Sequence, residues 1–479
     1  MRNSVLWLLI LSLGAVACGD DDAGDTDAAL DAEMGVDSAS EMADAGPDLY
    51  PVNDCDGFDA ANCVRIEPGD SEGLLEAVNL LTADTTVVLG AGTYALDNQV
   101  TIRASGINLV GQGIEETTLA FTGIETQVNG VDVQGNDFLV QDLTVLDAPK
   151  DGIRIENSVG VTYRRIRTTW TNEGDSNNGA YGIYPVRCEN VLIEDCIAER
   201  ASDAGLYVGQ CINVIVRNNE VRGNVAGLEI ENTQFADVYN NLAEDNTAGV
   251  VVFDLPGNPI VGRDVRLRDN MVINNNRRNF APGGVVAIIP AGTGTFAMAS
   301  RRVEITNNTY MNNRTLDIGL ISGQVVEPAS AWELETATLV GTWEDLGLLP
   351  GEAPGTISNF RSENIMVASN SHEGSGTRPD VSKDIGLLLT LVYSGRNTPS
   401  IVYDTIGESS FDPDAPENNS NDNRMCVGGN VMAEGFGSLD LETQSETPGS
   451  PHLVLDEPPF APFDCTELEG GPVAEVVLP

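Results

Sequence analysis

A column of charged and aromatic residues in the middle of the chain has the composition of a sugar-binding surface. The second residue after the glycine in four Gly-apolar-x-apolar segments is, in chain order, Arg154, Tyr184, Tyr207 and Glu229. Alternate side chains of a strand point to the same face, so these four would form an outward column. Tyrosine rings pack on the apolar face of a sugar, while arginine and carboxylates bond its polar groups. We therefore predict carbohydrate binding by the set Arg154, Tyr184, Arg187, Asp203, Tyr207, Glu229, Glu231 and Asp254.

The same residues leave two alternatives open. An ordinary solvated sheet face also carries mixed charges and aromatic rings that pair across neighbouring strands. A polysaccharide lyase or C5-epimerase acting on uronic-acid glycans would need a base for the sugar proton and a group that neutralises the carboxylate. Its candidates are Arg187 or Lys150 as base and Tyr184 or Tyr207 as acid, with a calcium ion held by Glu229, Glu231 or Asp254. Whether the protein is an enzyme stays open, and apart from that calcium we expect no metal and no cofactor.

The elements that position this column recur every 22 or 23 residues. Gly182, Gly205 and Gly227 lie 23 and 22 residues apart, and a second apolar strand follows each of them. Recurrence at this period without a helical pattern is typical of a parallel β-solenoid. Asparagines follow the later second strands, and we expect them to stack as a ladder in which each side chain bonds the next rung: Asn219, Asn241, Asn270, Asn308 and Asn370.

The repeat block at residues 178–269 is similar to a known family. The segments that carry the likeness are NGAYGIYPVRCENVLIEDC, ASDAGLYVGQCINVIVRNN, NVAGLEIENTQFADVYNN and NTAGVVVFDLPGNP. They resemble the exported bacterial parallel β-helix repeat proteins of the pectin-lyase-like superfamily. The resemblance implies an all-β fold, a right-handed three-sheet parallel β-helix. It does not imply an activity.

A more distant likeness concerns one strand. The segment Tyr-Gly-Ile-Tyr-Pro-Val-Arg at residues 181–187 resembles the Tyr-Gly-Ile-Asp-Pro-His-Asp strand of mannuronan C5-epimerases. Tyr184 stands in place of the first Asp, Val186 in place of the His and Arg187 in place of the second Asp. All three catalytic positions have changed type, so the resemblance implies that this machinery is absent here.

The N-terminal 54 residues have the features of an export signal and a tether. Arg2 precedes an apolar run at residues 5–16 that is too short to span a bilayer, and Ala15-Val16-Ala17-Cys18 resembles a bacterial lipobox. We predict a lipoprotein signal peptide at residues 1–17 and lipidation of Cys18, with simple cleavage after Ala17 as the alternative. Residues 18–54 are acidic and poor in aromatics, which favours a disordered tether. The expected location is the bacterial cell envelope, anchored to a membrane.

The rest of the chain divides into a solenoid and a cap. We predict the parallel β-helix over residues 55–410, with a capping helix at residues 71–81 and an insertion at about residues 324–360. Residues 411–479 would form a loop-rich C-terminal cap. Because an exported location permits disulfides, we expect the pairs Cys55–Cys63 and Cys426–Cys465. Cys188 and Cys211 share one register of adjacent rungs, so they form either a third disulfide or stacked free thiols.

The charge of the chain limits its partners. The net charge is −48, and a phosphate backbone would be repelled by it. Nucleic acid is therefore excluded as a partner. The predicted partners are a carbohydrate and, through the lipid anchor, a membrane.

Overall fold

The computed structural model describes residues 53–335, 355–412, 414–431, 434–441, 443, 452–457, 460–465 and 467–479. The compact unit that contains them is Asn53–Pro479. The predicted signal peptide, Cys18 and nearly all of the predicted tether lie outside the described residues, as do residues 336–354 of the predicted insertion. None of the helices in the described ranges combines the length and the apolar character needed to cross a bilayer.

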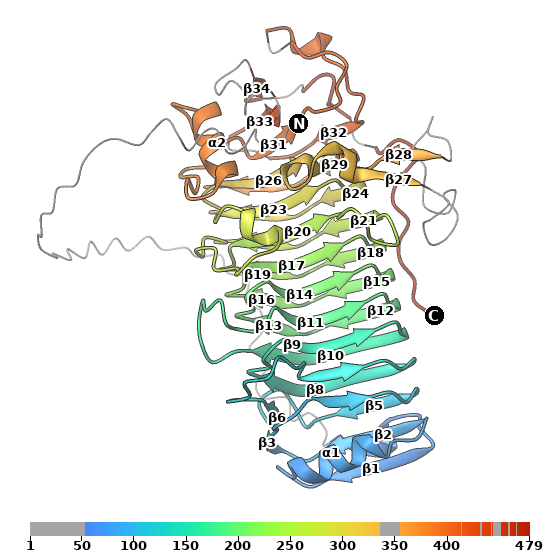
Figure 1. Ribbon diagram of the computed structural model, residues 1–479. Helices are drawn as coiled ribbons and strands as arrows, with labels where there is room; N and C mark the ends of the chain where they lie inside the picture. Colours follow the sequence, from blue (N-terminus) through green and yellow to red (C-terminus); the bar gives the residue numbers. More distant parts are fainter. Residues whose placement is uncertain are drawn as a thin grey trace, which may run out of the picture. The chain divides into compact units, whose positions relative to one another are not determined.

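The described chain is a stack of parallel rungs whose strands form walls along one axis (Figure 1). One wall is a twelve-stranded sheet, parallel except for its last pair. Its members are β4 (Val100–Ile102), β7 (Val131–Val133), β9 (Asp151–Glu156), β11 (Tyr181–Val186), β14 (Ala204–Gly209), β17 (Ala226–Glu231), β20 (Ala248–Phe253), β23 (Thr293–Met298), β26 (Leu316–Ile321), β31 (Ile401–Asp404), β33 (Phe436–Leu439) and β34 (Val454–Leu455).

The other twenty strands make two further parallel walls. These walls are joined because β8 and β10 each run through the bend between them. The first holds β1 (Asn62–Ile66), β2 (Thr85–Leu89), β5 (Ile107–Val110), β8 (Phe138–Leu146), β10 (Val159–Thr169), β12 (Glu189–Glu194), β15 (Ile212–Arg217), β18 (Gln234–Tyr239), β21 (Arg263–Arg268), β24 (Arg301–Thr306), β29 (Glu363–Ala368) and β32 (Met425–Gly428). The second adds β3 (Gly92–Ala95), β6 (Thr117–Ala120), β13 (Ile197–Glu199), β16 (Glu220–Arg222), β19 (Leu242–Glu244), β22 (Met271–Ile273), β25 (Thr309–Met311) and β30 (Ser371–Glu373). The predicted three-sheet architecture is confirmed.

Alternation along the strands separates two apolar clusters. In β20, Val250 and Val252 belong to the core inside the coil, whereas Val251 and Phe253 belong to a second cluster on the outer face. Successive side chains of a strand point to opposite faces, so strands such as β14, β17 and β20 supply both clusters, whereas β4, β7 and β9 supply only the inner core. We call the second cluster the outer apolar layer. It also includes Trp332 and residues of η3 (Val285–Ile288) and α2 (Asp384–Val392).

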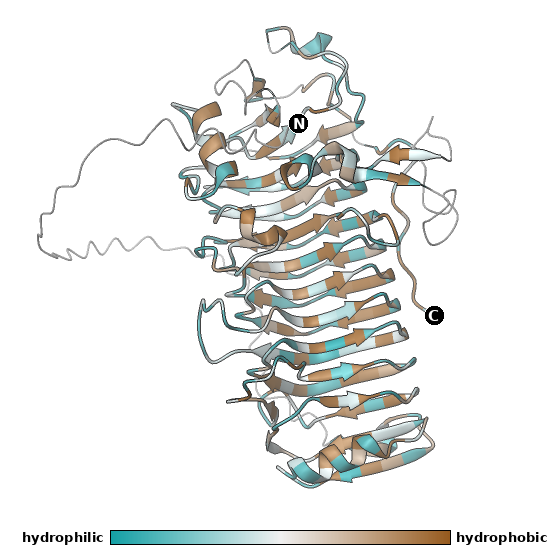
Figure 2. Cartoon of the chain, viewed as in Figure 1, coloured by the Kyte–Doolittle hydropathy of each residue, from teal (hydrophilic) through white to brown (hydrophobic). Residues whose placement is uncertain are grey.

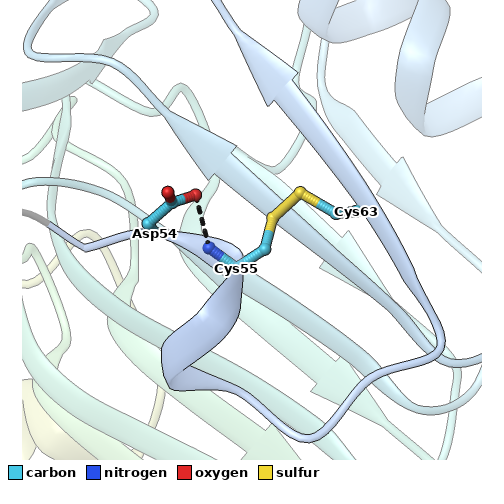
Figure 3. Close-up of side chains that lie close together, drawn as sticks. All are labelled: Asp54, Cys55 and Cys63. Carbon is cyan, nitrogen blue, oxygen red and sulfur yellow. Dashed lines mark hydrogen bonds between the residues drawn. A yellow bond between two sulfur atoms is a disulfide. The ribbon is translucent and has the colours of Figure 1, made fainter.

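The N-terminal end of the coil is closed by α1 (Ser71–Asn79). Leu74 and Val78 of this helix are buried in the inner core. The Asp70 side chain caps the helix by accepting a hydrogen bond from the Gly73 amide at 2.9 Å. The short helix η2 (Cys55–Gly57) precedes β1, and a disulfide joins Cys55 to Cys63 there (Figure 3).

The C-terminal end carries α2 and irregular segments. Helix α2 is largely apolar (Figure 2) and packs its buried residues into the outer apolar layer. The second expected disulfide, Cys426–Cys465, ties β32 to the following loop. The short helix η7 (Pro416–Asn418) lies in this part of the chain.

The described parts of the predicted insertion form a small projection. They comprise η4 (Gly323–Val325), η5 (Ala329–Trp332) and an antiparallel hairpin of β27 (Glu333–Glu335) and β28 (Thr356–Ser358) (Figure 1). Trp332 anchors the projection because its buried ring packs against Gly323, where a Cβ would come within 2.3 Å of the ring.

Two asparagine ladders hold the turns of the later rungs. In the predicted ladder, the Asn219 backbone and side-chain amides both donate to Asn241 Oδ1 at 2.9 Å. The same pattern continues through Asn270, Asn308, Asn370 and Asn430. A second ladder, which we did not predict, stands five residues further along and comprises Asn224, Asn246, Asn275 and Asn313.

The stacked cysteines form a thiol and hydroxyl ladder. Cys188, Cys196 and Cys211 are buried free thiols, so the structure has the stacked-thiol alternative and no disulfide between Cys188 and Cys211. The Cys188 amide donates to Cys211 Sγ at 3.3 Å, and the Cys211 amide donates to Thr233 Oγ1 at 3.3 Å. The Cys211 thiol therefore takes the acceptor role that the Thr233 hydroxyl takes in the neighbouring rung.

Candidate functional site

The outer face of the twelve-stranded sheet changes from polar to apolar along the stack. In register across neighbouring strands stand Asp132, Arg154, Tyr184, Tyr207 and Glu229, followed by Val251, Phe296, Gly319 and Val402. The apolar side chains Val251, Phe296 and Val402 belong to the outer apolar layer. Of the polar members, Arg154 and Tyr184 are half-buried and could contact a ligand, whereas the others are buried.

Three tyrosines pack together at the boundary, and we call them the tyrosine cluster. Tyr181, Tyr184 and Tyr207 have ring centroids 4.6–4.8 Å apart. Tyr181 and Tyr184 are half-buried, whereas Tyr207 is only 4% exposed. Half-exposed rings that are fixed by a buried third ring offer a rigid apolar surface of the kind on which a sugar ring packs.

Arg154 lies beside the tyrosine cluster and is held by two acids. Its guanidinium is 3.4 Å from Asp132 and 2.5 Å from Glu156, and it lies 5.9 Å from the centroid of the Tyr184 ring. Arg187 reaches the other oxygen of Glu156 at 2.5 Å. Glu156 therefore links Arg154 and Arg187 in a short row of ion pairs beside the cluster.

Three carboxyl groups lie under or beside the tyrosines. Asp203 is half-buried, Glu231 is buried and Glu229 is 2% exposed. The Tyr181 hydroxyl bonds Asp203 and the Tyr207 hydroxyl bonds Glu231. Burial, followed by the nearby charge of Glu231, raises the pKa of Asp203 to about 7, and burial raises that of Glu229 well above its usual range. The site thus contains acids that hold a proton near neutral pH.

The predicted residue Asp254 has a different role in the structure. It is buried, and both its oxygens accept from the Gly262 amide, at 3.0 and 2.9 Å. The Asn359 side chain donates to it at 2.9 Å. Asp254 therefore joins the 254–262 loop to the end of the insertion and does not face the tyrosine cluster.

Two site residues were missed by sequence reasoning. Tyr181 and Asp151 stand opposite each other across β11 and β9, each directly before a strand glycine. Burial raises the pKa of Asp151 to about 6, and Lys150 Nζ lies 4.0 Å from its carboxylate. The signal that could have found both residues was the register of the repeat, because the position before the glycine holds alanine in the next three rungs.

Pockets flank the strands of this face at both ends. One, of about 790 Å³, lies between the loop at residues 173–176 and the loop at residues 277–282. The other, of about 470 Å³, includes Arg187, Gln210 and Pro259. Phe280 and Ala281 of the first pocket and Tyr181 and Tyr184 all pack against the outer apolar layer. Neither pocket includes Glu229, which remains beneath the surface.

Within the described ranges, one tight group of metal-ligating side chains occurs, at Asp54, Cys55 and Cys63 (Figure 3). The two cysteines are joined in a disulfide. Zinc and similar ions are bound by the thiolate form of cysteine. A disulfide sulfur is not a thiolate, so neither cysteine of this group can serve as a zinc ligand. Its remaining side chain, Asp54, bonds Arg65.

Comparison with known proteins agrees with the geometry of the stack. Residues 105–265 match the family model described as "Right handed beta helix region". This stretch is a right-handed β-helix. The predicted right-handed coil is therefore confirmed, and so is the predicted resemblance to parallel β-helix repeat proteins.

Solved structures with a similar right-handed β-helix are distant in sequence. The A-module of the mannuronan C-5 epimerase AlgE6 of Azotobacter vinelandii is 14% identical, with a TM-score of 0.45, and the alignment covers 77% of this chain and 92% of that one. Pectate lyase Pel9A is also 14% identical, with a TM-score of 0.38, over 55% of this chain and 72% of that one. At these identities the likeness concerns the fold alone.

A curated relative matches a short part of the chain. It is the undecaprenyl phosphate-alpha-4-amino-4-deoxy-L-arabinose arabinosyl transferase of Pseudomonas aeruginosa, which is 30% identical over 90 residues. The match covers 19% of this chain and 16% of the length of the transferase.

Proposed function

We propose that this β-helix protein binds carbohydrate at the tyrosine cluster, without chemistry of its own. The observation that carries the proposal is the packing of Tyr181 and Tyr184, half-exposed and fixed by the buried Tyr207, beside Arg154. The rings supply an apolar surface, and the charged groups at its edge supply hydrogen bonds to hydroxyl groups.

We also propose that the protein is exported to the bacterial cell envelope and anchored through Cys18. The sequence of residues 1–18 supports this location. The disulfides Cys55–Cys63 and Cys426–Cys465 add support, because disulfides persist in oxidising compartments outside the cytosol.

Affinity measurements on a glycan panel test the binding proposal. The panel holds neutral, acidic and amino-bearing oligosaccharides, and the protein is residues 53–479. We expect Tyr184→Ala to weaken the best ligand roughly five- to tenfold, which is the contribution of one aromatic contact. The matched control is Tyr239→Ala, since Tyr239 is also half-buried but stacks on Arg268 of another wall. The proposal is wrong if the unmodified protein binds none of the glycans in the panel.

A uronic-acid lyase or epimerase is the second candidate. The observation that favours it is the closeness of Tyr184 to Arg154, which would place a proton donor beside a group that neutralises a carboxylate. Burial, followed by the charge of Asp151, raises the pKa of Tyr184 to about 12, so its hydroxyl keeps its proton. Incubation with polyuronates, with and without calcium, separates the candidates, because a lyase forms unsaturated ends that absorb ultraviolet light.

A further inference from the structure

The charges around the tyrosine cluster divide into paired and unpaired acids. Asp132 and Glu156 contact Arg154, and Asp151 has Lys150 nearby. Within the described part of the chain, no ion pair reaches Asp203, Glu229 or Glu231. These three carboxyls come from β17 and the turn before β14, so the acids without an ion pair lie together at one end of the cluster.

In two of these acids one carboxyl oxygen also lacks a hydrogen-bond partner. In the described ranges, Asp203 Oδ1 and Glu229 Oε2 are buried oxygens that accept no hydrogen bond. A buried oxygen without a donor costs about 1–3 kcal/mol, so such atoms mark places where a partner is missing. The missing partner is a group with several N–H or O–H donors, and a positive one would also favour the ionised form of these acids and pair with it.

The segment beside Asp203 carries two glycines. The segment that faces this carboxyl carries Gly283 and Gly284, which are both exposed. A Cβ added at Gly284 would lie 3.7 Å from Asp203 Oδ2, and a Cβ at Gly283 would meet nothing within 4 Å. This segment therefore places no side chain over Asp203, which is itself half-buried.

We propose that the tyrosine cluster selects saccharides that bear a free amino group, with the ammonium bound by Asp203 above Glu229. The inference rests on the proposed carbohydrate function and names its ligand class. An ammonium supplies three donors and a positive charge, and it is also attracted to the faces of the tyrosine rings. An N-acetylated sugar lacks this charge, and a uronic acid would bring a negative charge to three acids that have no cation partner among the described residues.

Binding should release protons. The groups that face Asp203 and Glu229 are mostly acids and phenols, and burial keeps protons on both acids. These groups are Asp151, Tyr181, Tyr184, Tyr207 and Glu231, and Arg154 lies beside Tyr184. An ammonium favours the ionised form of a carboxyl beside it. At pH 6, below the pKa of Asp203 of about 7, we expect release of up to one proton for each ligand bound.

Calorimetry tests the proposal with three ligands of one length: a glucosamine trimer, its fully N-acetylated form and a galacturonic acid trimer. Residues 53–479 are used at pH 6 in 150 mM salt, in two buffers of different ionisation enthalpy. We expect the amino trimer to bind at least tenfold tighter than the acetylated trimer, with proton release. The galacturonic acid trimer is expected to bind most weakly.

Matched variants locate the effect. Asp203→Asn removes the proposed contact and should reduce the preference for the amine to less than about threefold, and Glu229→Gln should reduce both the preference and the proton release. Glu475→Gln, at an exposed acid of the C-terminal segment, controls for general attraction of a cation to an acidic protein. Thermal unfolding of each variant checks that it is folded.

The outcomes are distinguishable. Equal affinity for the three trimers, tighter binding of the acetylated or acidic trimer, or an unchanged preference in folded Asp203→Asn and Glu229→Gln would overturn the inference and leave carbohydrate binding standing. If no saccharide of the wider panel binds, both the proposed function and the inference are wrong.

Discussion

At the scale of single residues, Glu229 and Glu231 show how two acids of one strand come to differ. Glu231 accepts from Asn258 Nδ2 at 2.9 Å, whereas Glu229 Oε2 has no donor among the described residues. Donors stabilise a carboxylate, and burial without donors stabilises the protonated acid. The two side chains are two positions apart on β17, so the difference arises from what covers each of them.

This difference predicts opposite effects of two conservative changes. The folded protein keeps the Glu229 proton where the unfolded chain, with a pKa of about 4.3, has released it, so stability falls as the pH rises from about 4 towards the folded pKa. Glu229→Gln removes this loss and should flatten the slope of unfolding free energy between pH 5 and 8 by up to about 1.4 kcal/mol per pH unit. Urea unfolding at several pH values measures the slope.

The matched control is Glu231→Gln. Its carboxylate is replaced by an amide, which is a weaker acceptor for Asn258 and Tyr207. We expect a loss of stability of about 1 kcal/mol. Burial also raises the pKa of Glu231, but its hydrogen-bond donors oppose the shift, so the change of slope should be smaller than for Glu229→Gln. If Glu229→Gln leaves the slope unchanged, the burial argument for this acid is wrong.

At the scale of elements, the asparagine ladders fix the turn between walls of the coil. Asn241 accepts two hydrogen bonds from Asn219 and donates one to the Val216 carbonyl at 3.0 Å. Asn241→Ala would leave these buried groups unpaired. We expect a loss of about 1–3 kcal/mol in the free energy of unfolding, measured by urea denaturation.

The end of the same ladder provides the control. Asn430 receives the two bonds of Asn370 but is half-buried, so water can replace it. Asn430→Ala should therefore cost clearly less than Asn241→Ala. Equal losses would mean that burial does not set the value of a ladder position.

At the scale of the whole molecule, a β-helix exposes strand edges and core at its ends unless they are covered. Helix α1 covers the N-terminal end with Leu74 and Val78. The double variant Leu74→Ser and Val78→Ser should expose this end and shift the protein towards larger species in size-exclusion chromatography with light scattering. Leu80→Ser changes a leucine that is 71% exposed just beyond the helix, and it should leave the size unchanged. A double variant with the parent's size would contradict a capping role for α1.

The sequence by itself determined the coil. The glycine spacing of 22 and 23 residues, the asparagines from Asn219 to Asn370 and the outward position of Tyr184 are local and periodic, because every rung meets the same neighbours above and below. The second ladder has the same period and lies five residues further along the chain, so the sequence could also have predicted it. Arg154, Tyr184 and Tyr207 were placed on the outer face by alternation alone.

Only the tertiary structure decided what covers that face. Glu229 lies beneath the surface, Asp254 bonds Asn359 from 105 residues away, and α2 contributes to the layer over β20 and β23. The segments that provide this cover interrupt the repeat and fold back from distant positions, so no period predicts their contacts. Burial, in turn, determines which acids keep their protons. The chemistry of the site therefore depends on the segments that cover the sheet as much as on the strands that carry the acids.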